Sequence, residues 1–122
     1  MIDCFFFDSY AIIEIFKGSP KYKVFLDSMI IITKLNLFEV YYKILRDFGQ
    51  DMAKSILEKY QKFVIDYDSE IIASAAKFKL ENKSKNLSMA DCIGYKLAEY
   101  LNIKFLTGDC QFEKLPNVEY VK

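Results

Sequence analysis

The segment that decides the fold is I-D-C-F-F-F-D-S, residues 2–9. From Ile2 to Phe7 it is a short, nearly continuous run of apolar and aromatic residues, and the run stops at Asp8. Such a run is typical of a strand that is buried on both faces, and strands of this kind belong to parallel sheets. We therefore expect the first strand of a parallel sheet here, with Asp8 at its carboxyl end.

Strands and helices are predicted to alternate along the rest of the chain. Short apolar runs rich in β-branched residues predict further strands at 29–32, 63–65, 104–107 and 118–121. Apolar residues at helical spacing and capping residues predict helices at 9–16, 20–26, 34–48, 51–60, 69–82 and 88–101, with one turn at 111–114. This alternation favours an α/β protein with a mainly parallel sheet.

Length and composition favour one compact domain over residues 1–122. The chain has 122 residues, of which 52% are hydrophobic, and this is enough for a sizeable core. Lys plus Arg and Asp plus Glu each total 17, so no net charge attracts the whole molecule to a polyanion. Because no apolar run approaches the roughly 20 residues that span a bilayer, we expect a soluble, cytoplasmic protein with no membrane partner.

The absence of histidine restricts the chemistry. Without it there is no Ser-His-Asp or Cys-His pair and no imidazole metal ligand. Cys4, Cys92 and Cys110 are an odd set without C-x-x-C spacing, which argues against a disulfide framework and a structural zinc site. Any reaction must then depend on carboxylates, lysines or hydroxyls.

Three acidic residues fall where parallel sheets bind ligands, outside the carboxyl ends of the strands. Asp8 ends the first strand, Glu39 lies in the first turns of the helix after the second, and Asp109 follows the strand at 104–107. Asp91 lies in the first turn of the helix before that strand, so its position at the same edge depends on how the chain crosses.

Each of these acids also has a structural explanation. Asp8 would cap the following helix, and Asp109 lies in an ordinary turn. Glu39 and Asp91 match the acid of a capping box whose first residue comes three positions earlier. As a set, however, the acids have apolar neighbours, and Arg46 is the chain's only arginine. A divalent cation would neutralise such carboxylates, and oxygen ligands favour Mg²⁺ or Mn²⁺.

Four blocks of sequence resemble the PIN-domain nucleases, in particular the VapC-like toxins of prokaryotic toxin–antitoxin pairs. The blocks are F-F-F-D-S at 5–9, N-L-F-E-V at 36–40, S-M-A-D-C-I at 88–93 and F-L-T-G-D at 105–109. The resemblance covers essentially the whole chain. It implies a PIN-like α/β/α sandwich with a five-stranded, mainly parallel sheet in the order 3-2-1-4-5.

The resemblance also implies a site and an activity. Its catalytic, metal-binding quartet would be Asp8, Glu39, Asp91 and Asp109, holding Mg²⁺ or Mn²⁺ for hydrolysis of phosphodiester bonds in single-stranded or structured RNA. The supporting polar residues would be Ser9, Asn36 and Thr107. A homodimer and a separate antitoxin chain are the implied protein partners.

Other features are compatible with more than one interpretation. Lys83 and Lys85 concentrate positive charge in one loop, where they would contact RNA phosphates or simply form a solvated surface. A surplus of aromatic residues on the helices agrees with a homodimer. The alternatives to a nuclease are a phosphorelay receiver-like domain, which expects adjacent acids after the first strand, and a catalytically idle PIN fold that acts as a binding module.

Overall fold

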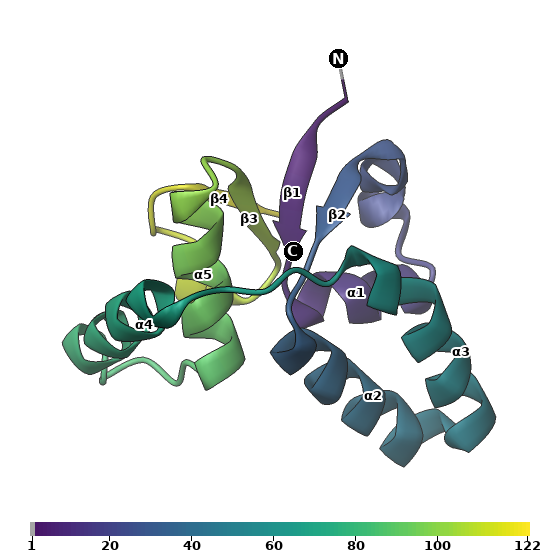
Figure 1. Ribbon diagram of the computed structural model, residues 1–122. Coiled ribbons are helices and arrows are strands. Elements are labelled where there is room, and N and C mark those ends of the chain that lie inside the picture. Colours follow the sequence, from purple (N-terminus) through teal and green to yellow (C-terminus); the bar gives the residue numbers. More distant parts are fainter. Residues whose placement is uncertain (1) are drawn as a thin grey trace.

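The computed structural model describes residues 2–122, which fold around a parallel sheet (Figure 1). The sheet has four strands in the order β2-β1-β3-β4, and all three neighbouring pairs are parallel. The strands are β1 (Cys4–Phe7), β2 (Met29–Ile31), β3 (Lys104–Thr107) and β4 (Val118–Tyr120). An α/β fold with a parallel sheet is therefore confirmed.

The helices lie close to the predicted ranges. The α-helices are α1 (Ser9–Phe16), α2 (Lys34–Phe48), α3 (Gln50–Tyr60), α4 (Ser69–Glu81) and α5 (Met89–Tyr100). Three 3-10 helices connect other elements: η1 (Pro20–Asp27), η2 (Gln61–Phe63) and η3 (Cys110–Phe112).

Side chains that alternate along the strands build two cores, one on each face of the sheet. Phe7 and Leu106 are fully buried in the core that α1, η1, α2 and α3 cover. Phe6 and Phe105 point to the opposite face, where α4 and α5 cover them. Figure 1 shows α4 and α5 gathered on one side of the strands and α1 to α3 on the other. The continuous aromatic run at the start of the chain is explained by this burial on both faces.

The prediction of five strands was wrong at residues 63–65. Only Val64 pairs with the sheet, through a single parallel bridge to Ile32 beyond the end of β2. Its two hydrogen bonds run from Ile32 N–H to Phe63 O (3.2 Å) and from Ile65 N–H to Ile32 O (3.0 Å). Thr33 already caps α2, so the segment that follows β2 offers residues 63–65 no further strand residue to pair with. The bridge nevertheless lies outside β2, at the position that the expected order gives to the third strand.

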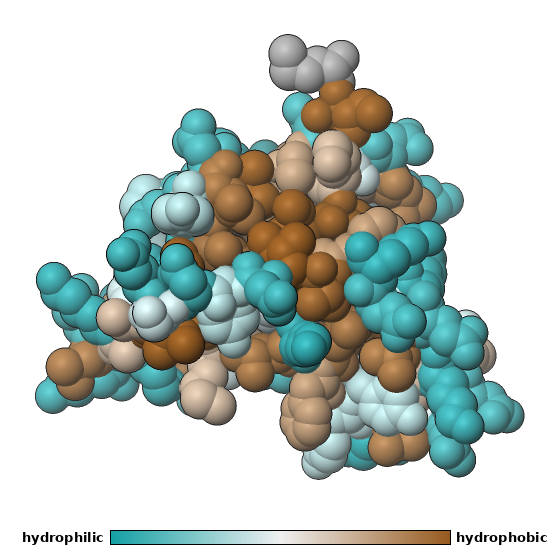
Figure 2. Space-filling view, viewed as in Figure 1, coloured by the Kyte–Doolittle hydropathy of each residue, from teal (hydrophilic) through white to brown (hydrophobic). Residues whose placement is uncertain are grey.

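Apolar side chains are also exposed on the surface. Figure 2 shows apolar residues gathered over the middle of one face, near β1 and β2, with hydrophilic residues on its flanks. On α2, Phe38, Tyr42 and Leu45 recur at helical spacing and are 72%, 54% and 41% exposed. Within residues 2–122, no helix combines the length and the hydrophobicity that crossing a membrane requires.

Candidate functional site

Asp8 and Asp109 lie at the carboxyl edge of the sheet because their strands are neighbours. Phe7 of β1 is in register with Leu106 of β3, and the Asp8 N–H donates to the Leu106 carbonyl over 3.2 Å. Asp8 directly follows β1, and Asp109 comes two residues after Thr107, the last residue of β3. The expected position of both acids at this edge is therefore observed.

The Asp8 carboxyl group is buried, with 2% of the residue exposed. It caps α1, because its Oδ1 accepts a hydrogen bond from the Ala11 N–H at 2.8 Å. Burial raises the pKa of Asp8 to about 8; hydrogen bonds from Thr107 and Ala11 oppose the rise, and the charges of Asp91 and Asp109 add to it. Without a nearby cation, this group is therefore largely protonated at neutral pH.

Asp91 lies in the first turn of α5 and forms a capping box with Ser88. Its Oδ2 accepts from the Ser88 N–H at 2.9 Å, and its own N–H donates to Ser88 Oγ at 3.0 Å. Burial also raises the pKa of Asp91, and the charges of Glu39 and Asp109 contribute to the rise. The negative charges of these acids therefore act on one another at this edge of the sheet.

A chain of hydrogen bonds runs from Thr33 to Glu39, and the donor of each bond can be identified. The Thr33 N–H donates to Asn36 Oδ1 (3.0 Å), and since a backbone N–H can only donate, the Asn36 amide nitrogen must face the other way. That nitrogen lies 3.4 Å from Ser9 Oγ and donates to it. Ser9 in turn donates its hydroxyl hydrogen to Glu39 Oε1 over 2.7 Å. Thr33, Asn36 and Ser9 are all buried, so little water competes with these bonds.

Thr33 was not among the predicted site residues. Together with Asn36 it forms a capping box at the start of α2, and the T-x-x-N spacing in the sequence was the available signal. The alternative that paired Asn36 with Glu39 in a capping box was wrong, because Thr33 occupies that role. Glu39 therefore has no capping function at this helix start. Asp8, Asp91 and Asp109, by contrast, all accept capping hydrogen bonds.

The turn that carries Asp109 is held on both sides. The Asp109 N–H donates to Thr107 Oγ1 at 3.0 Å, and Asp109 Oδ1 accepts from the Gln111 N–H at 3.0 Å. Gly108 between them is buried, and a Cβ at this position would overlap the Tyr10 ring and the Val121 carbonyl oxygen. Only glycine lets the chain pass so close to these atoms.

The four acids have suitable chemistry for a hard divalent cation. All are oxygen ligands, and none forms an ion pair with Lys or Arg within residues 2–122. The ion pairs of that part of the chain are Lys17–Glu14, Arg46–Asp47 and Lys96–Glu99. As placed, however, no three Cys, Asp or Glu side chains in this part converge closely enough to hold a metal ion. The donor set fits Mg²⁺ or Mn²⁺ in type and charge, and binding would require these side chains to draw together.

The two lysines predicted as RNA contacts lie in the loop between α4 and α5. Lys83 is exposed, whereas Lys85 is half-buried and its Nζ donates to the Gln111 carbonyl over 3.0 Å. Because Gln111 is two residues from Asp109, this loop borders the acidic site. Lys85 thus has a structural contact that the sequence did not reveal.

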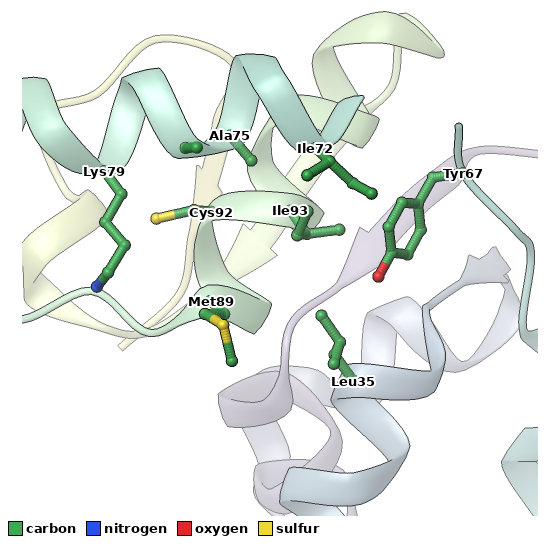
Figure 3. Close-up of a pocket in the computed structure, with 9 residues that line it drawn as sticks. Leu35, Tyr67, Ile72, Ala75, Lys79, Met89, Cys92 and Ile93 are labelled. Atoms are coloured by element: carbon green, nitrogen blue, oxygen red, sulfur yellow. The ribbon is translucent and has the colours of Figure 1, made fainter. Parts of the chain in front are cut away.

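A cavity of about 480 Å³ lies beside the acidic site, since Cys92 in its wall directly follows Asp91, and none of the four acids lines it (Figure 3). It is lined by Leu35, Tyr67, Ile72, Ala75, Ala76, Lys79, Met89, Cys92 and Ile93. Figure 3 shows Leu35 and Tyr67 on one side and the side chains of α4 and α5 on the other. Its walls are mostly apolar and include no carboxylate, so a site that depends on carboxylates is better placed at the four acids.

Comparison with known families identifies the family of this chain. Residues 5–118 match the family described as the PIN domain. Because the match covers nearly the whole chain, this protein belongs to the PIN-domain family.

Among solved structures, the neighbours include VapC toxins of VapBC toxin–antitoxin complexes. One is the Mycobacterium tuberculosis toxin VapC20, described as cleaving the sarcin–ricin loop: TM-score 0.76, 15% identity, covering 97% of this chain and 99% of that one. A second is VapBC2 from Rickettsia felis bound to a promoter DNA fragment: TM-score 0.72, 18% identity and 97% of both chains. A third is a toxin–antitoxin complex from Klebsiella pneumoniae: TM-score 0.72, 19% identity, covering 93% and 94%. No curated protein matches the sequence.

Proposed function

We propose that this PIN domain is a Mg²⁺- or Mn²⁺-dependent endoribonuclease and the toxin of a VapBC-type toxin–antitoxin pair. The observation that carries the proposal is the buried Asp8, whose pKa is raised to about 8 and which has neighbouring acids but no Lys or Arg partner within residues 2–122. A buried carboxylate of this kind is costly unless a cation neutralises it. In proteins such perturbed groups concentrate at functional sites.

In this proposal, Asp8, Glu39, Asp91 and Asp109 hold the metal directly or through water. When bound, a divalent cation lowers the pKa of a water molecule and offsets the negative charge that develops on the phosphodiester. No histidine is needed for this chemistry.

The supporting residues hold the acids in place. Ser9 donates its hydroxyl hydrogen to Glu39 Oε1 and so orients this carboxyl group. Thr107 accepts the Asp109 N–H and contributes a hydrogen bond that opposes the raised pKa of Asp8. Both residues are buried, so they restrict the rotamers of the acids they contact. Lys83, which is exposed in the loop beside Asp109, would contact an RNA phosphate.

The toxin assignment is supported by the likeness in fold to proteins of toxin–antitoxin complexes, among them VapBC2 from Rickettsia felis. A separate antitoxin chain and a second copy of this chain are the proposed protein partners. The exposed stripe of Phe38, Tyr42 and Leu45 on α2 and the apolar cavity beside Met89 are surfaces that such partners would cover. RNA cleavage by a toxin would take place in the cytoplasm.

The test is cleavage of labelled single-stranded and structured RNA by wild type and Asp8→Asn. We expect cleavage with Mn²⁺ or Mg²⁺, none after chelation, and a loss of about a hundredfold or more in the variant. Circular dichroism checks that the variant is folded, and Asp51→Asn, at an exposed position of α3, is the matched control. Equal cleavage by Asp8→Asn would refute the metal role of this acid. No cleavage by wild type with either metal would favour the idle PIN fold, and labelling by acetyl phosphate would favour a receiver.

A further inference from the structure

Gln111 connects two segments that lie far apart in the sequence. One is the loop of residues 82–88 between α4 and α5, which carries Lys83 and Lys85. The other is the turn after β3, which carries Asp109. Gln111 belongs to the second segment and is half-buried against the first.

The side-chain amide of Gln111 pairs with the backbone of Asn86 at two points. Its Oε1 accepts from the Asn86 N–H at 2.6 Å, and its Nε2 donates to the Asn86 carbonyl at 3.0 Å. This pairing needs a donor and an acceptor in one planar group, which among side chains of this length only glutamine supplies in uncharged form. The two hydrogen bonds resemble those of one residue pair in a β-sheet, although neither segment forms a strand.

The backbone of Gln111 makes two more contacts that matter for the site. Its N–H donates to Asp109 Oδ1 at 3.0 Å, and its carbonyl accepts from Lys85 Nζ at 3.0 Å. Gln111 therefore forms hydrogen bonds with Asn86 of the loop, with Lys85 and with Asp109. Because the acceptor of Lys85 is a neutral carbonyl, the positive charge of the ammonium group is not cancelled, and two of its three hydrogens remain available.

We propose that Gln111 is a positioning residue for RNA binding. Its two hydrogen bonds to Asn86, called the clasp below, attach the loop of residues 82–88 to the turn of Asp109. The clasp thereby holds the charges of Lys83 and Lys85 beside the acidic site. The inference rests on the proposed ribonuclease function. A substrate phosphate that approaches Asp109 then meets positive charge whose position has already been fixed, so less conformational entropy is lost on binding.

The test is Gln111→Met, which keeps the length of the side chain and the backbone N–H to Asp109 but removes both hydrogen bonds to Asn86. We expect the KM for RNA to rise about five- to tenfold with kcat within about twofold, since only substrate binding is affected. The slope of log Kd against log salt for RNA, measured without metal, should fall by about 1, as for the loss of one phosphate contact. Gln50→Met, at the exposed start of α3, is the matched control.

Lys85→Met provides a second variant, and it leaves the Gln111–Asn86 pairing in place. If the clasp acts through this lysine, the double variant binds RNA about as weakly as either single variant. Hydrogen exchange at the Asn86 amide provides a readout that needs no catalysis: protection should fall in Gln111→Met and persist in Lys85→Met.

These readouts separate the clasp from the proposed function. If wild type neither binds nor cleaves RNA, the proposed function and the role of the clasp in RNA binding both fail, and hydrogen exchange still shows whether the pairing exists. If wild type cleaves RNA and Gln111→Met changes kcat alone, or leaves KM, salt slope and Asn86 protection unchanged, the clasp is overturned and the ribonuclease proposal stands.

Discussion

The hydroxyl group of Ser9 donates a hydrogen bond to Glu39 Oε1 over 2.7 Å, across 30 positions of sequence. Asn36 determines the direction of this bond, because its amide nitrogen already donates to the same Ser9 oxygen. Ser9 therefore has its single hydrogen free for Glu39, which must be the acceptor. A carboxylate held in this way is oriented before any ligand arrives.

Ser9→Ala should weaken metal binding more than it weakens the fold. Loss of the bond to Glu39 is expected to raise the Kd for Mn²⁺ about tenfold, the usual effect of removing a group that orients a ligand. The unfolding free energy should fall by only about 1 kcal/mol. Titration calorimetry measures the first quantity and urea denaturation the second. Ser19→Ala is the control, since the Ser19 side chain makes no capping hydrogen bond; equal Mn²⁺ affinity in wild type and Ser9→Ala would contradict the role.

Asp8 should make the stability of the metal-free protein fall as pH rises. Its pKa is raised to about 8 in the folded protein from an ordinary value of 3.8, so the folded state binds a proton that the unfolded state releases. The stabilisation is complete below about pH 4 and is lost as pH rises toward 8, by up to about 1.4 kcal/mol per pH unit. Urea denaturation in chelator at pH 5, 6, 7 and 8 measures it. Asp8→Asn should remove this component, and Asp51→Asn should retain it; identical slopes in wild type and Asp8→Asn would show that Asp8 titrates normally.

Added Mn²⁺ should raise the melting temperature, and more at pH 8 than at pH 5. The ion binds the ionised form of Asp8, and protons compete for that carboxylate at the lower pH. At a concentration about 100 times the Kd, the gain is about 2.7 kcal/mol. Differential scanning calorimetry with and without chelator measures the shift. A pH-independent shift, or one that persists in Asp8→Asn, would place the ion elsewhere.

Gly108→Ala should damage both the fold and the site. The added methyl group would overlap the Tyr10 ring and the Val121 carbonyl oxygen, so the turn between Thr107 and Asp109 must shift. A cost of about 1 to 3 kcal/mol is expected for overpacking of this kind. Thermal denaturation measures the cost, and cleavage at a temperature where the variant is folded measures the displacement of Asp109. Unchanged stability and cleavage would mean that the Tyr10 ring and the segment of Val121 move to accommodate the methyl group without cost.

Local sequence determined which elements form and which edge of the sheet the acids occupy. The aromatic run at 2–7 predicted a strand buried on both faces, and Phe6 and Phe7 do face opposite cores. Asp8 and Asp109 could be placed because Asp8 directly follows β1 and only Gly108 separates Asp109 from the end of β3. Placing Asp91 required the family resemblance, because it precedes its strand by a whole helix.

Tertiary structure alone decided the features that depend on pairing between distant segments. Residues 63–65 have the composition of a strand, but β2 ends at Ile31 and Thr33 turns the chain into α2, so only one bridge to Val64 is left. The contacts of Lys85 and Asn86 with Gln111 cross 25 or 26 positions and leave no periodic signal in the sequence. Composition and spacing encode the helices and strands, because their hydrogen bonds and buried faces repeat locally. The raised pKa of Asp8, the direction of the Ser9 bond and the clasp at Gln111 arise only when folding buries these groups and brings their partners together.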